Sequence, residues 1–190
     1  PVVVHIIHNG EPVGTGTNIS EAQVLSQIKV LNEDFRRENA DAINTPPMFQ
    51  GVAGSMDITF VLAKRDPDGK NTDGNVRVKG SKTSWTSNDN YELKAQSYWP
   101  SEDYMNIWVC NITDFLGYSQ FPVSGLPGLE GSSTNELTDG VVLYYRAFGS
   151  SQDGNFNLEA DYDRGRTATH EISHFFGLRH IWGDEDGCDG

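Results

Sequence analysis

The sequence has few basic residues, few cysteines and no long apolar run. Of its 190 residues, 14 are Lys or Arg and 27 are Asp or Glu, which gives a net charge of −13. So few cations are a poor match for a phosphate backbone, and the composition therefore argues against a nucleic-acid partner. No apolar run reaches the roughly eighteen residues that a membrane-spanning helix needs. We therefore expect a soluble protein with no membrane partner.

The two cysteines, Cys110 and Cys188, are too few for a disulfide framework. Cys110 lies in the apolar run NIWVCNI, which predicts a buried free thiol. The first ten residues, PVVVHIIHNG, lack the charged region and the cleavage site of a signal peptide, so we expect that any export signal has already been removed. A chain of this length can form one domain with a sizeable core.

Several segments have the composition of β-strands. Five are predicted, at residues 2–8, 56–63, 105–112, 116–122 and 140–148. The fourth is short, contains Gly and ends in Pro, which is typical of an edge strand. Residues 64–100 are polar and are predicted to form a long surface excursion with a short strand at 75–79.

Two helices are predicted between and after these strands. The first begins after Ser20, with Ser20 as N-cap and Gln23 as its capping-box partner. One of its faces packs on the sheet, and the other is expected to carry charged side chains such as Asp34 into water. The second helix contains THEISHFFGLRH, residues 169–180. Strands and helices in this order predict a mixed α/β fold with helices against the sheet.

The stretch THEISHFFGLRH has the spacing of a metal site. His170 and His174 are four residues apart and so project from one face of a helix, where two imidazoles can bind one ion. Glu171 lies beside the same cleft, where it can hold a water. Gly177 suits the left-handed residue that ends a helix, which lets His180 turn back as a third ligand.

Three imidazoles with one position left for water are typical of a catalytic zinc site. Zinc is favoured over iron because no carboxylate replaces a histidine in the ligand set. Glu171 would then act as general base and acid in the hydrolysis of a peptide bond. Two alternatives remain: a half-buried helix that binds no metal, and a zinc site that does no chemistry. The first must explain five coincident residues, and the second leaves Glu171 without a role.

HEISHFFGLRH fits the pattern H-E-x-x-H-x-x-G-x-x-H at every fixed position, which is the zinc signature of the metzincins. Other stretches of the chain indicate which metzincin family it resembles. They are GTGTNISEAQVLSQIKVLNEDFRREN, NIWVCNI, LGYSQFP, GVVLYYRAFG and GRTATHE. The chain resembles the pappalysin family of metzincin metalloendopeptidases, especially its secreted bacterial and archaeal members. The resemblance covers most of the chain and is weakest between residues 64 and 100.

The resemblance implies zinc ligands at His170, His174 and His180, and a general base and acid at Glu171. It implies a mixed, mostly parallel five-stranded sheet with a backing helix and an active-site helix. It also implies that the edge strand at residues 116–121 lines the cleft and pairs with an extended protein or peptide substrate, as an exposed edge allows. An extracellular location follows from the secreted members.

Metzincins continue after the third histidine into a C-terminal lobe with a methionine turn. Here Met48, Met56 and Met105 all precede the motif, and ten residues follow His180. We therefore expect residues 1–190 to be mainly the N-terminal lobe of a catalytic domain, truncated shortly after the zinc motif, with Cys188 paired to a cysteine of the missing lobe. The other reading is a zinc-binding interaction or adhesion module without turnover.

Calcium is the second metal to consider, since some pappalysins bind it near the site. The acidic residues after the motif favour it slightly over a solvated end, and they are Asp184, Glu185, Asp186 and Asp189. Asp184 is alternatively a carboxylate that orients a zinc histidine. The stretch DPDGKNTDGN, residues 66–75, lacks the glycine and the glutamate of an EF-hand loop and is predicted to be a solvated turn. His5 and His8 fall on opposite faces of the first strand, which argues against a shared metal.

Overall fold

The computed structural model describes residues 1–123 and 129–180, and it contains one five-stranded sheet. The strands are β1 (Val2–His8), β2 (Asn75–Lys79), β3 (Met105–Cys110), β4 (Gly117–Ser119) and β5 (Val141–Tyr144). Their spatial order is β2-β1-β3-β5-β4. All neighbours are parallel except β4, which pairs antiparallel with β5 and ends the sheet. The predicted mixed, mostly parallel sheet is confirmed, and the edge strand predicted at residues 116–122 is the shorter β4.

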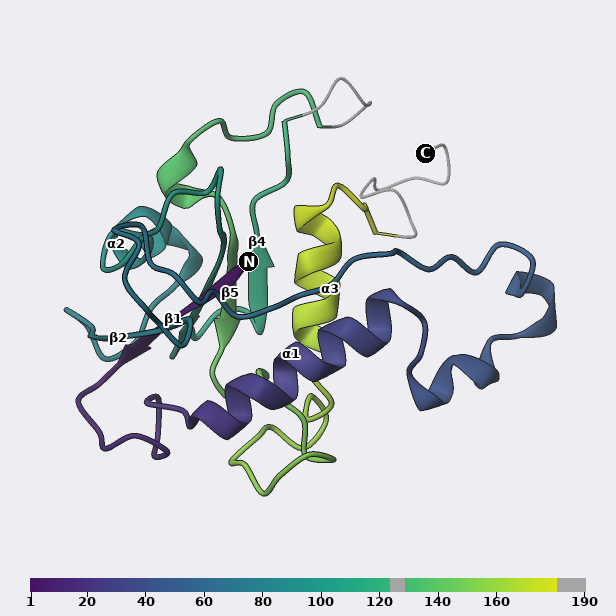
Figure 1. The fold of residues 1–190 in the computed structure, drawn as a ribbon, viewed down its shortest axis with the longest axis horizontal. Coiled ribbons are helices and arrows are strands. Elements are labelled where there is room, and N and C mark those ends of the chain that lie inside the picture. The colour runs from purple at the N-terminus through teal and green to yellow at the C-terminus, as the bar shows by residue number, and fades with distance from the viewer. Residues whose placement is uncertain (124–128, 181–190) are drawn as a thin grey trace.

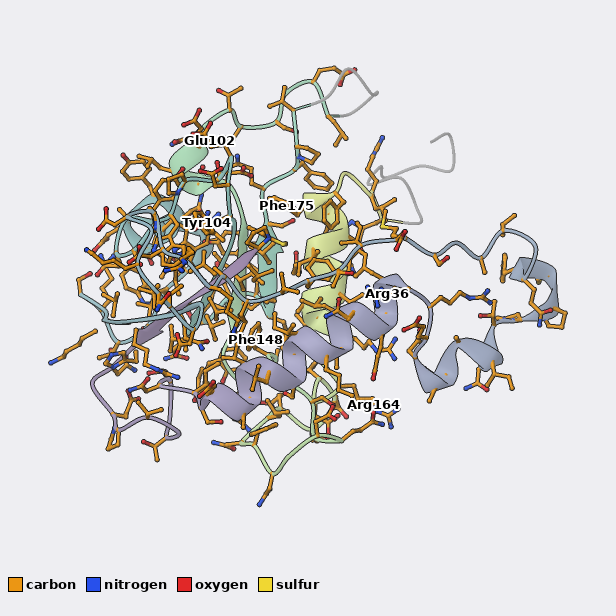
Figure 2. All side chains as sticks on the ribbon, viewed as in Figure 1. Arg36, Glu102, Tyr104, Phe148, Arg164 and Phe175 are labelled. Atoms are coloured by element: carbon orange, nitrogen blue, oxygen red, sulfur yellow. The ribbon has the colours of Figure 1, made fainter. Side chains whose placement is uncertain are left out.

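The long helices α1 (Glu21–Phe35) and α3 (Arg166–Phe175) pack against each other on one face of the sheet (Figure 1). Alternate residues of the strands, among them Val4, Ile107 and Leu143, form the main core with Leu31 of α1. Phe148 also belongs to this core and lies next to α1 (Figure 2). This packing fixes α3 beside the edge of the sheet.

The opposite face of the sheet is covered by the short helix α2 (Asn90–Lys94), which follows the 3-10 turn η3 (Ser87–Asp89). Leu93 of α2 packs there with Trp85, Trp108 and Val142. Three further 3-10 turns are η1 (Ala40–Asn44), η2 (Pro47–Phe49) and η4 (Glu136–Thr138). The sheet is therefore enclosed on both faces, which is why the central strands β1, β3 and β5 are nearly continuous apolar runs.

The structure corrects the predicted strand at residues 56–63. Apart from one bridge between Leu62 and Val2, this segment has no strand structure, and the fifth strand is β2. Residues 64–100 are also more than a surface excursion. Trp85, Leu93 and Trp99 are buried within this stretch. β3 and β5 end before the predicted residues 112 and 148.

Ser20 caps α1 as predicted, because its side chain accepts a hydrogen bond from the Gln23 backbone. The Gln23 side chain does not complete a capping box. Its amide instead donates to the carbonyls of Tyr145 and Phe148. Cys110 is a buried free thiol, as predicted. No helix in the described ranges is both long enough and apolar enough to cross a membrane.

Candidate active site

The start of α3 is fixed from α1 by a buried glutamine. Gly165, at the N-cap, has a φ of 72°, a left-handed conformation that suits glycine. A Cβ there would also lie 2.9 Å from Nε2 of Gln27. The Gln27 side chain donates to the Gly165 carbonyl at 3.0 Å and accepts from the Gly149 amide at 2.7 Å. The loop that enters α3 is thus tied to the backing helix.

The chain turns after α3 at Gly177, as the sequence predicted. Gly177 has a φ of 90°, and its amide donates to the His174 carbonyl at 2.8 Å. The next amide, of Leu178, donates to the Ser173 carbonyl at 2.9 Å. This pair of bonds is a Schellman motif, which closes the helix and reverses the chain. The reversal brings His180 back to the helix.

The structure brings the three predicted histidines together. The Nε2 atom of His174 lies 3.0 Å from Nε2 of His170 and 3.2 Å from Nε2 of His180. His170 is exposed, His180 is half-buried and His174 is buried. Burial and the two neighbouring histidines lower the pKa of His170, which favours its neutral, metal-binding form. Within the described ranges, these residues are the one group of His, Cys, Asp or Glu side chains with metal-ligand spacing.

The hydrogen bonding of His174 suits a metal ligand. Its Nδ1 atom lies 2.6 Å from the Leu178 carbonyl, which can only accept, so Nδ1 carries the proton and Nε2 keeps its lone pair. A backbone carbonyl in this role orients the ring of a metal ligand. Four nitrogens in tetrahedral coordination at zinc distances are about 3.3 Å apart, close to the spacing of these Nε2 atoms. The residues present therefore fit a zinc ion.

Glu171 is buried, with 8% of its surface exposed. Burial raises the pKa of its carboxyl to about 7, and nearby His180 counteracts this rise. Glu171 follows His170 in α3, and its side chain lies close to Gly117 of the edge strand β4. A group with such a pKa can both accept and donate a proton near neutral pH.

Gly117 allows β4 to approach Glu171. A Cβ at Gly117 would lie 2.9 Å from Cγ of Glu171 and 2.8 Å from Cδ2 of Leu143. A groove of about 950 Å³ runs beside His170 and Glu171, between residues 114–117 on one side and residues 160–167 on the other. The predicted edge strand therefore lines a cleft at the histidine cluster. This role of Gly117 could not be predicted from the sequence, because its contact with Glu171 depends on long-range packing.

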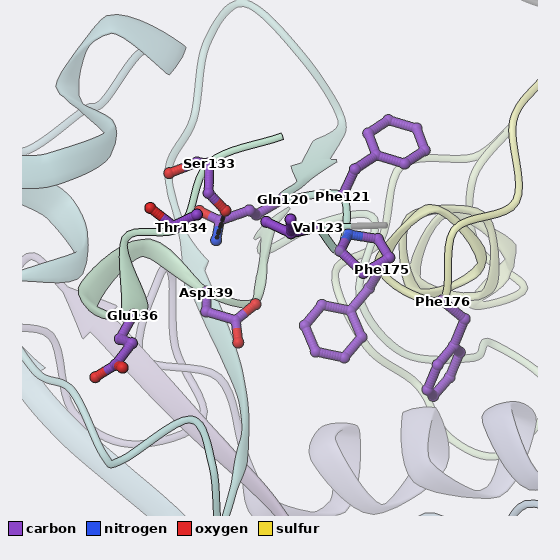
Figure 3. A pocket seen from close by; sticks show the side chains of 10 residues that line it. Gln120, Phe121, Val123, Ser133, Thr134, Glu136, Asp139, Phe175 and Phe176 are labelled. Atoms are coloured by element: carbon purple, nitrogen blue, oxygen red, sulfur yellow. Dashed lines mark hydrogen bonds between the residues drawn. The ribbon is translucent and has the colours of Figure 1, made fainter. Parts of the chain in front are cut away.

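A second hollow, of about 570 Å³, lies at the other end of β4 (Figure 3). The carboxylate of Asp139 and the ring of Phe175 point into it from opposite sides (Figure 3). Phe121 also lines it, and its ring centroid lies 5.1 Å from that of His174. The strand β4 therefore lies between the two hollows, with one at each of its ends.

The structure corrects the prediction that the Asp34 side chain points into water, because this side chain is buried between α1 and α3. Its side chain is 4% exposed and accepts a 2.6 Å hydrogen bond from the Thr169 hydroxyl. It also pairs with Arg166 at 3.3 Å, and Arg166 reaches Asp41 at 2.7 Å. Burial raises the pKa of Asp34, while Thr169 and Arg166 oppose the rise. The carboxylate thus ties α1 to α3 one residue before His170.

The weaker candidates stay apart from this site. His5 is buried between Asn106 and Ser97, to which its ring nitrogens are hydrogen-bonded, and burial lowers its pKa to about 4. His8 ends β1 elsewhere in the sheet. The loop at Asp66 is a turn, as predicted. The Asp66 side chain accepts hydrogen bonds from the backbone amides of Asp68 and Lys70. Cys188 and the four acidic residues from Asp184 to Asp189 lie outside the described residues.

Comparison with known proteins places the chain among metalloproteases. An extracellular metalloprotease of Verticillium alfalfae is 28% identical over 195 residues, which cover all of this chain and 53% of that protein. The structure of mature mirolysin from Tannerella forsythia with a cleaved peptide is 45% identical, with a TM-score of 0.85. It matches all of this chain, which covers 67% of the mirolysin chain. A structure of mirolysin with a small compound is 46% identical, with the same TM-score and coverage.

No family model matches the sequence. The chain spans about half the length of the curated relatives it matches. It covers a larger share of mirolysin, and the likeness there extends over both sequence and fold.

Proposed function

The chain belongs to the metalloprotease family that includes mirolysin, and from this premise we propose that the protein containing it is a zinc-dependent metalloendopeptidase. We assign it to the metzincins because HEISHFFGLRH carries their residues at every fixed position, and to their pappalysin group because flanking stretches such as GRTATHE resemble that family. The observation that carries the proposal is the convergence of three Nε2 atoms beside a buried Glu171 in an open groove.

His170, His174 and His180 are the proposed zinc ligands. The hydrogen bond from His174 to the Leu178 carbonyl supports this assignment, because it fixes the tautomer that leaves Nε2 free. When bound, zinc supplies Lewis acidity, which acidifies water and polarises the peptide carbonyl. Calcium is a further proposed ion, on the acidic residues after the motif, and nothing in the described residues bears on it.

Glu171 is the proposed general base and acid. It takes a proton from the attacking water and returns it to the nitrogen of the leaving peptide. Its burial supports the role, because a carboxyl with a raised pKa holds a proton more readily between the two steps. Gly117 lets the edge strand approach this carboxyl, so a substrate on that strand lies within its reach.

The substrate is proposed to be a protein or peptide in extended form. β4 ends the sheet, and its outer edge can accept a substrate strand through backbone hydrogen bonds. A solved structure of mirolysin is in complex with a cleaved peptide, which supports a peptide substrate here. We propose an extracellular location, since the fungal relatives are named extracellular metalloproteases.

Residues 1–190 are proposed to be mainly the N-terminal lobe of the catalytic domain. A C-terminal lobe of the same protein would complete the cleft beneath the histidines. The partial coverage of the relatives and of mirolysin supports a longer parent protein.

The test is cleavage of casein by the full-length protein with Glu171→Gln as the decisive variant. Loss of general base catalysis should lower the rate by about 10² to 10⁴-fold while zinc stays bound. Glu21→Gln is the matched control, because it makes the same substitution at an exposed glutamate in the first turn of α1. Casein cleavage that survives chelation, or that Glu171→Gln leaves intact, contradicts the proposal. Stoichiometric zinc with no turnover would instead favour an interaction or adhesion module.

A further inference from the structure

Lys94, the last residue of α2, is a buried cation on the face of the sheet opposite α3. Its side chain is among the largest that are fully buried, with 1% of the residue exposed. Burying an ammonium group is costly unless specific partners compensate for the lost water. The position of this charge therefore calls for a role that an apolar residue could not fill.

The partners of Lys94 belong to the edge of the sheet. Its Nζ atom donates a 2.6 Å hydrogen bond to the carbonyl of Thr138, in the connection between β4 and β5. Nζ also lies 5.0 Å from the ring centroid of Trp108 and 5.4 Å from that of Tyr118, within cation–π range. Burial lowers the pKa of Lys94 to about 7, and the charge of nearby Asp139 opposes this fall.

These contacts reach the middle of β4 and the residue that follows it. Tyr118 is the middle residue of the strand, and its hydroxyl lies 3.1 Å from the Asn90 side chain of α2. The hydroxyl of Thr138 donates to the Gln120 side chain at 2.6 Å, directly after the strand. Lys94 thus holds Tyr118 through its ring and Gln120 through Thr138.

We propose that Lys94 is a positioning residue that fixes the substrate-binding edge strand β4 through Thr138 and Tyr118. This inference rests on the proposed function, because it requires β4 to receive an extended peptide. β4 has three residues and three register pairs with β5, so it has little rigidity of its own. A strand that must accept a partner on its outer edge needs support from behind, and Lys94 supplies it from α2.

A change at Lys94 should affect peptide binding on β4 and leave the catalytic step unchanged. Lys94 lies on the far face of the sheet from the histidines, while β4 contacts α3 through Gly117. Replacing Lys94 by methionine keeps most of the side-chain volume and removes the ammonium group. The variant should loosen the strand and leave the zinc ligands unchanged. Peptides that pair along β4 should therefore bind less well, whereas a short peptide held at the metal should be unaffected.

The experiment uses the full-length protein and two peptides from one casein sequence. One has about ten residues, enough to span β4 in extended form, and the other is a capped tripeptide around the same bond. Lys94→Met should raise the KM of the long peptide about tenfold and change its kcat and both constants of the tripeptide less than about twofold, since the hydrogen bond that the amine donates to the Thr138 carbonyl in either protonation state is lost. Lys94→Arg, which keeps a cation, should recover part of the lost affinity. Lys79→Met, on β2 at the far edge, is the matched control.

The same comparison in a Glu171→Gln background measures peptide dissociation constants by fluorescence anisotropy without cleavage. If the native enzyme cleaves neither peptide, the proposed function fails, and the anisotropy ratio still decides the role of Lys94. Equal losses for both peptides, or an unchanged KM for the long one, overturn the inference. If Lys94→Met does not fold, Thr138→Val removes the hydroxyl that bonds to Gln120 and to the Asn135 carbonyl and keeps the backbone carbonyl that Lys94 contacts. This variant should weaken binding of the long peptide about threefold. An unchanged affinity there overturns the inference as well.

Discussion

The Thr169 hydroxyl donates a 2.6 Å hydrogen bond to the Asp34 carboxylate, which joins the backing helix to the residue before the first candidate zinc ligand. Arg166 pairs with the same carboxylate from the start of α3. The active-site helix is therefore held at its first turn from α1, as well as by the sheet. If Asp34 were neutral, Arg166 would lose its ion pair with α1 and keep the one with Asp41.

Asp34→Asn should lower the free energy of unfolding by about 1–2 kcal/mol, because the amide keeps the shape and an acceptor for Thr169 but loses the charge that pairs with Arg166. Zinc affinity should fall several-fold as α3 loosens. Urea denaturation and competition with a chelator measure the two effects. Glu33→Gln is the control, since the neighbouring side chain is 42% exposed. Equal effects of both substitutions would show that the Asp34 contacts are not responsible.

Substitution of the candidate ligands should remove the metal. His174→Ala eliminates the buried member of the cluster, and zinc affinity should drop by more than about 100-fold, beyond the range seen for outer-sphere partners. His170→Ala and His180→Ala should act in the same way. Metal content by mass spectrometry after dialysis measures the loss, with His8→Ala as control. Stoichiometric zinc in any of the three variants would remove that residue from the ligand set.

Much of the candidate site was predictable because its geometry is local. The four-residue spacing of His170 and His174 and the glycine at 177 act within about three helical turns, and local backbone rules determine them. The apolar strands were also predictable, since each is buried on both faces. The edge position of β4 followed from the predicted strand at residues 116–122, which is short, contains Gly and ends in Pro.

Long-range contacts explain what the sequence could not predict. The segment 56–63 alternates like a strand, but β2 takes the place beside β1, and only Leu62 bridges to Val2. Trp85 and Trp99 are isolated large side chains in a polar stretch, so local averages conceal their burial. The roles of Asp34 and Gln27 depend on partners more than 120 residues away. Lys94 likewise bonds to Thr138, outside any local pattern.

Gly117→Ala should reduce catalysis without removing zinc. The added methyl group would lie 2.9 Å from Cγ of Glu171 and 3.0 Å from the Val142 carbonyl, so either the carboxyl or the strand must shift. Because a misplacement of about 1 Å can cost about 100-fold in rate, kcat/KM on a peptide should fall between about tenfold and 100-fold. Gly51→Ala is the matched control, since a methyl group there meets nothing within 4 Å. Unchanged kcat/KM would mean that β4 does not constrain Glu171.

The buried Lys94 should make stability depend on pH above neutrality. Its pKa is lowered to about 7 by burial, whereas a lysine in an unfolded chain keeps a pKa of about 10.4. Below pH 7 both states carry the proton, and folding bears the full cost of burying the charge. Between these two pKa values the unfolded state binds more protons than the folded state, so the free energy of unfolding rises with pH.

Comparison with Lys94→Met isolates this effect, because other titrations cancel in the difference between the two proteins. The free energy of unfolding of the native protein minus that of the variant should increase from pH 7 to pH 9, by at most about 1.4 kcal/mol per pH unit. Asp139 faces Lys94 and favours its charged form, while burial raises the pKa of Tyr118 and Cys110 well above this range, so neither titrates within it. Urea denaturation at several pH values measures the difference. A difference that stays flat, or that falls with pH, would show that Lys94 keeps its proton in the folded protein and that its partners fully compensate for its burial.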